Sequence, residues 1–190
     1  MRRWGVLAGY TALLYLVVPY TPRVGLACLR TPAGGFLFGR GLVALVLLGA
    51  VALVAAFRRW QAPWTAYALL LAAGAGYLAA LRWLGVRPLE RVHLPEYGLA
   101  ALLAWRALRP SLGSDGAASV AAFALAAAIG WGEELVQAVT PGRYYALGDV
   151  AANALAAALA LVVLAAVRTA RSGCAPARER VAGAGLGVGG

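Results

Sequence analysis

Long runs of apolar residues follow one another along this 190-residue chain, and they limit what the chain can fold into. Six of these runs are near the roughly 17–25 residues that an α-helix needs to cross the hydrocarbon core of a bilayer. The runs cover residues 4–20, 41–57, 64–84, 92–108, 117–137 and 147–167. This pattern predicts an all-α protein, a polytopic integral membrane bundle of about six transmembrane helices.

The composition excludes several other classes of protein. Hydrophobic residues make up 63% of the chain and charged residues 13%, and the mean hydropathy is +0.77. Soluble domains have about 45–50% apolar and about 25% charged residues, and a chain this short cannot bury so much apolar surface in water. The net charge of +10 comes from 17 arginines and no lysine. Most of these arginines flank apolar runs, as in membrane proteins, and do not form the basic face of a nucleic-acid module.

Proline, glycine and arginine divide the chain into three regions. Residues 1–63 are predicted to hold two transmembrane helices, joined by a Pro/Gly-rich loop at residues 19–40. Residues 64–168 form a four-helix core, and residues 169–190 form a disordered cytoplasmic tail. The first apolar run is long for a signal peptide and has no clear cleavage site, so we expect an uncleaved helix.

The arginines also indicate how the chain is oriented in the cell membrane. If all six runs span, ten of the 17 arginines lie on the side of the N-terminus and seven on the opposite side. Because arginine is enriched on the cytoplasmic side of membrane proteins, both termini are predicted to be cytoplasmic.

Polar side chains within apolar helices are costly, so they are the first candidates for function. Three of the predicted helices carry them, and most are spaced three or four residues apart, on one helix face. The sets are His93, Glu96 and Tyr97; Glu133, Glu134 and Gln137; and Asp149 and Asn153, with Arg143 in the turn between the last two sets. If all three helices span, every set lies near the same membrane face. The arginine distribution places that face outside the cytoplasm, and we expect one polar site there.

These residues resemble the signature of the VanZ-like membrane proteins. The resemblance is carried by Glu133-Glu134-Leu135-Val136-Gln137, Pro141-Gly142-Arg143, Asp149-Val150 with Asn153, and His93-Leu94-Pro95-Glu96-Tyr97-Gly98-Leu99. It covers residues 64–168. The family usually has Asp-Glu where this chain has two glutamates, so Glu134 matches the fixed glutamate. The resemblance implies an association with low-level resistance to the glycopeptide teicoplanin, and it implies no established reaction.

Arg143 and His93 each have a chemical and a structural interpretation. Arg143 can clamp an anionic group through its planar guanidinium, or it can pair with Glu134 or Asp149 and fix the turn between helices. His93 can shuttle a proton or bind a metal, or it can form hydrogen bonds within the fold. No HExxH-type spacing is present, and we predict no metal site.

The carboxylates leave two alternatives open. They can act as paired groups for general acid–base chemistry, or they can lie at helix ends that are open to water. The four acids concerned are Glu96, Glu133, Glu134 and Asp149.

The remaining residues of the site are polar but uncharged. Gln137 and Asn153 contact a ligand or form hydrogen bonds between helices, and Tyr97 contacts a ligand or anchors its helix at the membrane interface. We expect no serine or cysteine near the cluster, which disfavours nucleophilic catalysis of the serine-triad type.

The resulting hypothesis is a VanZ-like multi-pass protein of the bacterial envelope that binds an anionic lipid-linked or headgroup ligand on the extracytoplasmic side. Arg143 would hold the anion. The partners of the protein would be the bilayer and a lipid-linked cell-wall intermediate or a glycopeptide. We expect no nucleic-acid partner, and the sequence identifies no cofactor. The alternative is an intramembrane hydrolase or transferase that acts on an envelope lipid through His93 and Glu134. A proton-coupled transporter is disfavoured because no polar relay crosses the bilayer.

Overall fold

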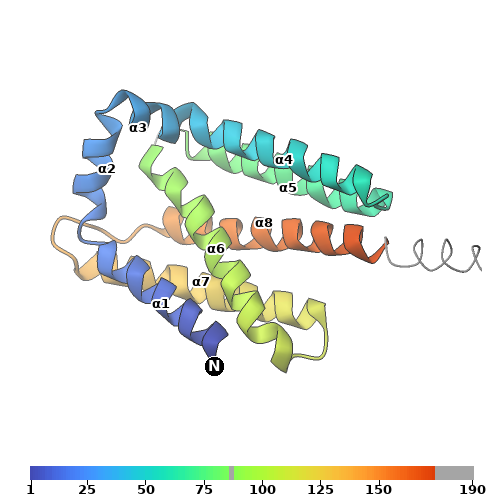
Figure 1. Ribbon diagram of the computed structural model, residues 1–190. Helices are drawn as coiled ribbons and strands as arrows, with labels where there is room; N and C mark the ends of the chain where they lie inside the picture. Colours follow the sequence, from blue (N-terminus) through green and yellow to red (C-terminus); the bar gives the residue numbers. More distant parts are fainter. Residues whose placement is uncertain (86–87, 174–190) are drawn as a thin grey trace, which may run out of the picture.

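The computed structural model describes residues 1–85 and 88–173, and the regular elements of this part of the chain are all helices. In chain order (Figure 1) they are α1 (Arg2–Val17), α2 (Thr21–Leu29), α3 (Pro32–Phe36), the π-helical η1 (Leu37–Gly41), α4 (Leu42–Arg59), α5 (Trp64–Trp83), the 3₁₀ segment η2 (Pro88–Val92), α6 (His93–Leu108), the 3₁₀ segment η3 (Arg109–Ser111), α7 (Asp115–Val139) and α8 (Leu147–Ser172). The all-α prediction is confirmed for these residues.

In the described part of the chain, four helices are long and apolar enough to cross a membrane: α4, α5, α7 and α8. All six predicted runs form helices, but a count of six spans is not confirmed. Helices α1 and α6 have 16 residues each, or about 24 Å at 1.5 Å per residue, against a hydrocarbon core of about 30 Å. Leu45, Leu48 and Val51 of α4 are each more than 60% exposed. An apolar face of this kind is consistent with a membrane protein.

Helices α6 and α8 form the centre of the bundle. In Figure 1, α4 and α5 run side by side along one edge, α8 runs through the middle, and α6 crosses the bundle obliquely. Helix α6 packs on α8, α7 and α1, and α8 also packs on α5 and α7. The contacts are made by small side chains, including Ala100 and Ala104 of α6 and Ala156 and Ala157 of α8, which have no exposed surface. Small residues allow helices to approach closely where packing drives their association.

Gly130 marks a close approach of α7 to α8 and α6. A Cβ atom at this position would lie 2.7 Å from Cβ of Asn153 in α8 and 3.0 Å from Cε1 of Tyr97 in α6. A glycine is therefore needed where the three helices meet. This crossing brings together the helix faces that carry the polar residues.

Helix α1 is joined to the same core as the later helices. Leu7 and Leu14 are buried in the main hydrophobic cluster together with residues of α5, α6, α7 and α8. Tyr10 donates a hydrogen bond to the backbone oxygen of Glu96 at 3.0 Å, and Tyr15 donates one to that of Ile129 at 2.7 Å. The N-terminal helix is thus fixed against α6 and α7.

The predicted loop at residues 19–40 is wrong, because most of this segment is helical. Pro32 begins α3, where proline is well tolerated because the first turn of a helix leaves its N–H unpaired anyway. Thr31 caps this helix: its hydroxyl accepts from the Gly34 amide at 3.0 Å and donates to the Cys28 carbonyl at 2.7 Å. In Figure 1, α2 and α3 stand across one end of the bundle.

The predicted disordered tail begins too early. Helix α8 continues to Ser172, so residues 169–172 are helical. Arg168 and Arg171 stack over Trp105 and Trp60, with guanidinium carbon to ring centroid distances of 4.8 and 5.1 Å. Such cation–π contacts favour the extra helical turn. Residues 174–190 of the predicted tail lie outside the described residues.

Candidate functional site

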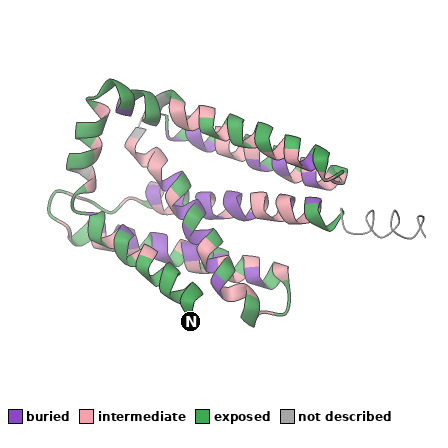
Figure 2. Ribbon diagram, in the orientation of Figure 1, coloured by how far each residue is buried: buried purple, intermediate pink, exposed green. Residues whose placement is uncertain are grey.

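The buried polar side chains lie together at the end of the bundle that α2 and α3 cover. In the part of the chain that the structure describes, the buried polar and charged side chains are His93, Glu133, Glu134, Gln137, Asp149 and Asn153. They come from the start of α6, the end of α7 and the start of α8, where Figure 2 shows buried residues inside the bundle. All six belong to the site that the sequence predicted. We call them, with Glu96, Tyr97 and Arg143, the polar cluster.

Glu133 links α6 to α7 through two neutral donors. The Tyr97 hydroxyl donates to Oε2 of Glu133, and the Gln137 amide donates to Oε1 of Glu133 at 3.1 Å. Tyr97 has no exposed surface, so the interpretation of this tyrosine as an anchor at the membrane interface is wrong. Its phenol instead serves as a buried donor to a carboxylate.

Glu134 has no exposed surface and is held by the backbone of the following turn. The amide of Ala146 donates to its Oε2 at 3.1 Å, and Gln137 donates to its Oε1 at 3.1 Å. Buried carboxylates are tolerated when donors surround them. These bonds fix the start of α8 against the end of α7.

Arg143 contacts an amide and a hydroxyl. Among the described residues its guanidinium donates twice to Oε1 of Gln137, once from Nε at 3.1 Å, and also to the Thr21 hydroxyl at 3.3 Å. The ion pair with Glu134 or Asp149, which was the structural alternative for Arg143, is not among the ion pairs of the described residues. Because Gln137 both accepts from Arg143 and donates to two glutamates, its amide separates the cation from the acids. No signal in the sequence placed Thr21 here, since it falls in the segment predicted to be a loop.

Asn153 forms an interhelical hydrogen bond. Its side-chain amide donates to the backbone oxygen of Gly130 at 3.4 Å, and the residue has no exposed surface. This is the structural alternative that the sequence left open for Asn153.

His93 lies between two glutamates. Its Nε2 is 3.9 Å from Oε2 of Glu90, and its Nδ1 is 3.9 Å from Oε2 of Glu96. The side chain of Asp149 is close to the same histidine. Glu90 was missing from the predicted site, although its place three residues before His93 puts it one helical turn away.

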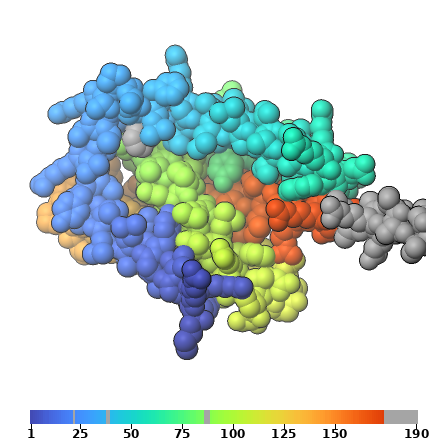
Figure 3. Space-filling model, in the orientation of Figure 1, coloured from blue at the N-terminus to red at the C-terminus, as the bar shows by residue number. Residues whose placement is uncertain are grey.

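A cavity of about 450 Å³ adjoins the polar cluster under α2, and we call it the α2 cavity. One side is apolar and includes Leu14 of α1 and Val24 of α2; the other carries His93, Glu96, Glu133 and Arg143. Figure 3 shows α2 standing off from the start of α6, with a hollow between them. The other five predicted site residues do not line this cavity: Tyr97, Glu134, Gln137, Asp149 and Asn153.

Cys28 also lines the α2 cavity and is exposed, with a free thiol. The expectation that no cysteine lies near the cluster is therefore wrong. The reason is the helical folding of residues 21–41, which returns α2 over the bundle end instead of leaving a loop in solvent.

A second cavity of about 500 Å³ lies between α4, α5, α6 and α8. Its walls are almost wholly apolar, with Leu45, Leu70, Leu94 and Leu164 among the lining residues. This cavity has space for an apolar chain, but no residue of the polar cluster lines it.

Compared with protein-family models, with curated proteins and with solved structures, the chain matches none of them.

Proposed function

We propose that this membrane protein binds a lipid-like ligand in the α2 cavity, with an anionic headgroup against Arg143. The observation that carries the proposal is the mixed lining of this cavity: α1 and most of α2 contribute apolar side chains, whereas η2, α6, α7 and the turn after α7 contribute charged ones. An amphiphilic molecule matches such a lining, because its chain and its headgroup need opposite environments.

The charges of the lining narrow the class of headgroup. Arg143 and the Thr21 hydroxyl lie 3.3 Å apart and both line the cavity, so they can bind a phosphate oxygen together. Glu90, Glu96 and Glu133 line the same space, and such carboxylates can accept hydrogen bonds from hydroxyl or ammonium groups. A headgroup with both a phosphate and several donors, such as phosphoglycerol or a phosphate-linked sugar, fits better than a bare anion.

The cell context of this binding rests on the resemblance to VanZ-like proteins. On that basis the ligand would be an envelope lipid or a lipid-linked cell-wall intermediate on the extracytoplasmic face. Its capture would change susceptibility to teicoplanin.

Binding is favoured over the hydrolase or transferase alternative by the position of Glu134. That alternative needs both His93 and Glu134 at the substrate. Glu134 has no exposed surface, accepts hydrogen bonds from Ala146 and Gln137, and does not line the α2 cavity. It can hold the helices together but cannot contact a substrate in that cavity without rearrangement.

The thiol of Cys28 offers a direct test, since it lines the cavity. The full chain with Cys174→Ser is purified in detergent, and the rate of maleimide labelling at Cys28 is measured with added phosphatidylglycerol or phosphatidylcholine. We expect phosphatidylglycerol to slow labelling several-fold and phosphatidylcholine to have little effect. Arg143→Gln should abolish the protection, whereas Arg59→Gln, at an exposed arginine on α4, should keep it. Equal rates with both lipids, or full protection in the Arg143 variant, would contradict the proposal.

The same thiol tests the side of the membrane. Intact cells that express the Cys174→Ser variant are treated with a membrane-impermeant maleimide, before and after lysis. Labelling of Cys28 in intact cells is expected for an extracytoplasmic site. Labelling only after lysis would move the cavity to the cytoplasmic side and remove glycopeptides from the candidate ligands.

A further inference from the structure

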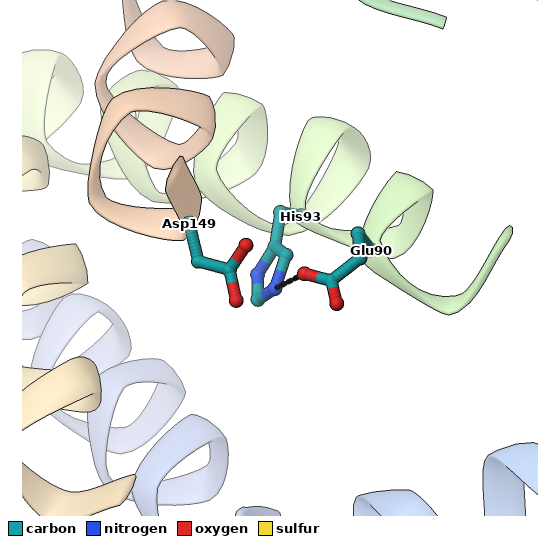
Figure 4. A group of neighbouring side chains, drawn as sticks. All are labelled: Glu90, His93 and Asp149. Atoms are coloured by element: carbon teal, nitrogen blue, oxygen red, sulfur yellow. Dashed lines mark ion pairs between the residues drawn. The ribbon is translucent and has the colours of Figure 1, made fainter. Parts of the chain in front are cut away.

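Three potential metal-ligating side chains from separate elements meet beside the α2 cavity. Glu90 belongs to η2, His93 to the first turn of α6 and Asp149 to the first turn of α8. One ligand atom from each of the three lies within 4.8 Å of the other two. In Figure 4, the carboxylates of Asp149 and Glu90 lie on the two sides of the His93 ring.

The histidine at the centre of this group is buried without a hydrogen bond at one ring nitrogen. His93 is only 6% exposed, and its Nδ1 has no hydrogen-bond partner within the described ranges 1–85 and 88–173. Its Nε2 faces Glu90 at 3.9 Å, which is beyond hydrogen-bond distance. A buried polar nitrogen that lacks a partner is costly, and neither Glu90 nor Glu96 comes within hydrogen-bond distance of the ring.

The distances suit a bound cation. Ligand atoms about 2.0–2.2 Å from a tetrahedral zinc ion are about 3.3–3.6 Å from one another. Because His93 Nε2 and Glu90 Oε2 are already 3.9 Å apart, a small shift of the two side chains would bring both to an ion. Metal-bound histidines commonly donate their other ring N–H to a carboxylate, and Glu96 lies 3.9 Å from Nδ1 in that position.

The site also has several carboxylates nearby. Five of the seven acidic residues of the chain lie at this end of the bundle: Glu90, Glu96, Glu133, Glu134 and Asp149. Carboxylate oxygens are ligands that divalent cations accept.

We propose that Glu90, His93 and Asp149 form a binding site for a divalent transition-metal ion, with Glu96 orienting the histidine. A nitrogen and carboxylate oxygens are ligands that zinc and its first-row neighbours accept. Three protein ligands leave at least one position open. Because Glu90 and His93 line the α2 cavity, the ion would be within reach of an anionic ligand there. The sequence placed His93 and Asp149 in one polar site, but it predicted no metal there and did not include Glu90.

Zinc itself is the probe for the test. The full-length protein is purified in detergent, stripped with a chelator and dialysed, and Zn²⁺ is titrated in competition with a chromophoric chelator. Elemental analysis then gives the zinc content per chain. We expect one Zn²⁺ per chain, and at least about tenfold weaker binding in His93→Ala and in Asp149→Asn. Asp115→Asn removes an acid at the opposite end of the bundle and should leave zinc affinity unchanged.

Size-exclusion chromatography and circular dichroism identify variants that have lost their fold. If His93→Ala is misfolded, His93→Gln replaces it, since glutamine keeps the approximate side-chain size. Co²⁺ gives a second readout, because visible absorption bands report a nitrogen and oxygen ligand set that should change in the folded variants.

Two results would overturn the site: no stoichiometric zinc in the wild-type protein, or unchanged affinity in both folded ligand variants. The titration contains no lipid, and the Cys28 labelling assay can be run with a chelator present. Failure of the metal site and failure of headgroup binding are therefore separate outcomes.

Discussion

The two ends of the bundle satisfy their charges in different ways. At the end where α7 begins, Asp115 forms ion pairs with Arg109 and Arg168, and all three side chains are at least one third exposed. At the opposite end, Glu133 and Glu134 are 6% and 0% exposed. Their partners are the Tyr97 phenol, the Gln137 amide and a backbone N–H, all uncharged.

The exposed ion pairs at Asp115 are typical of a structural contact, whereas the buried carboxylates at the opposite end mark the candidate functional site. Exposed ion pairs contribute little to stability, and those at Asp115 connect η3, α7 and α8 at low cost. Buried carboxylates are expensive even when neutral donors surround them. Their concentration beside a cavity is the reason why we propose a ligand at this end.

The largest expected effect comes from breaking the buried network at Gln137. Gln137→Leu removes the amide that serves Arg143, Glu133 and Glu134 together. Because three buried or half-buried groups then lose a partner, we expect unfolding free energy to fall by about 3–5 kcal/mol. Thermal unfolding in detergent measures this, with Ala138→Leu on the neighbouring exposed position as the control. An unfolding temperature equal to that of the wild type would show that this network does not hold the polar end together.

A smaller effect is expected at Tyr97. Tyr97→Phe keeps the ring packing but removes the donor to Glu133, while Gln137 still donates to that carboxylate. The expected loss is about 1–3 kcal/mol, the cost of leaving one carboxylate oxygen without its donor. Tyr144→Phe, at a tyrosine that is 74% exposed, should cost almost nothing in the same assay. If the two variants lose equal stability, the buried bond makes no net contribution.

The smallest effect is expected at the opposite end. Asp115→Asn removes the acid shared by Arg109 and Arg168, and about 0.2–1 kcal/mol should be lost at low salt. Since mobile ions screen exposed pairs, this loss should shrink at high salt, whereas the loss in Gln137→Leu should not. If Asp115→Asn loses the same unfolding free energy at low and high salt, the two ends of the bundle do not differ in how their charges are screened.

Much of the helical framework could be predicted from the sequence. Apolar runs indicated α1, α4, α5, α6, α7 and α8, because burial in a bilayer or a core demands continuous apolar segments. The spacing of polar residues indicated shared helix faces, and the alternating direction of successive helices indicated which ends converge. Helices α2 and α3 were missed because their prolines and glycines are equally typical of loops, and proline at a first helical turn is recognised only once the helix is seen.

The sequence by itself determined that the chain forms apolar helices and that their few polar residues gather near one end, because helix length and residue spacing are local properties. Only the tertiary structure decided which of those residues face a cavity and which bond to each other. His93, Glu96, Glu133 and Arg143 line the α2 cavity, while Glu134 is enclosed between helices. The physical reason is the rotation and close approach of the helices, set by contacts such as that of Gly130 with Asn153, which no spacing along the chain encodes.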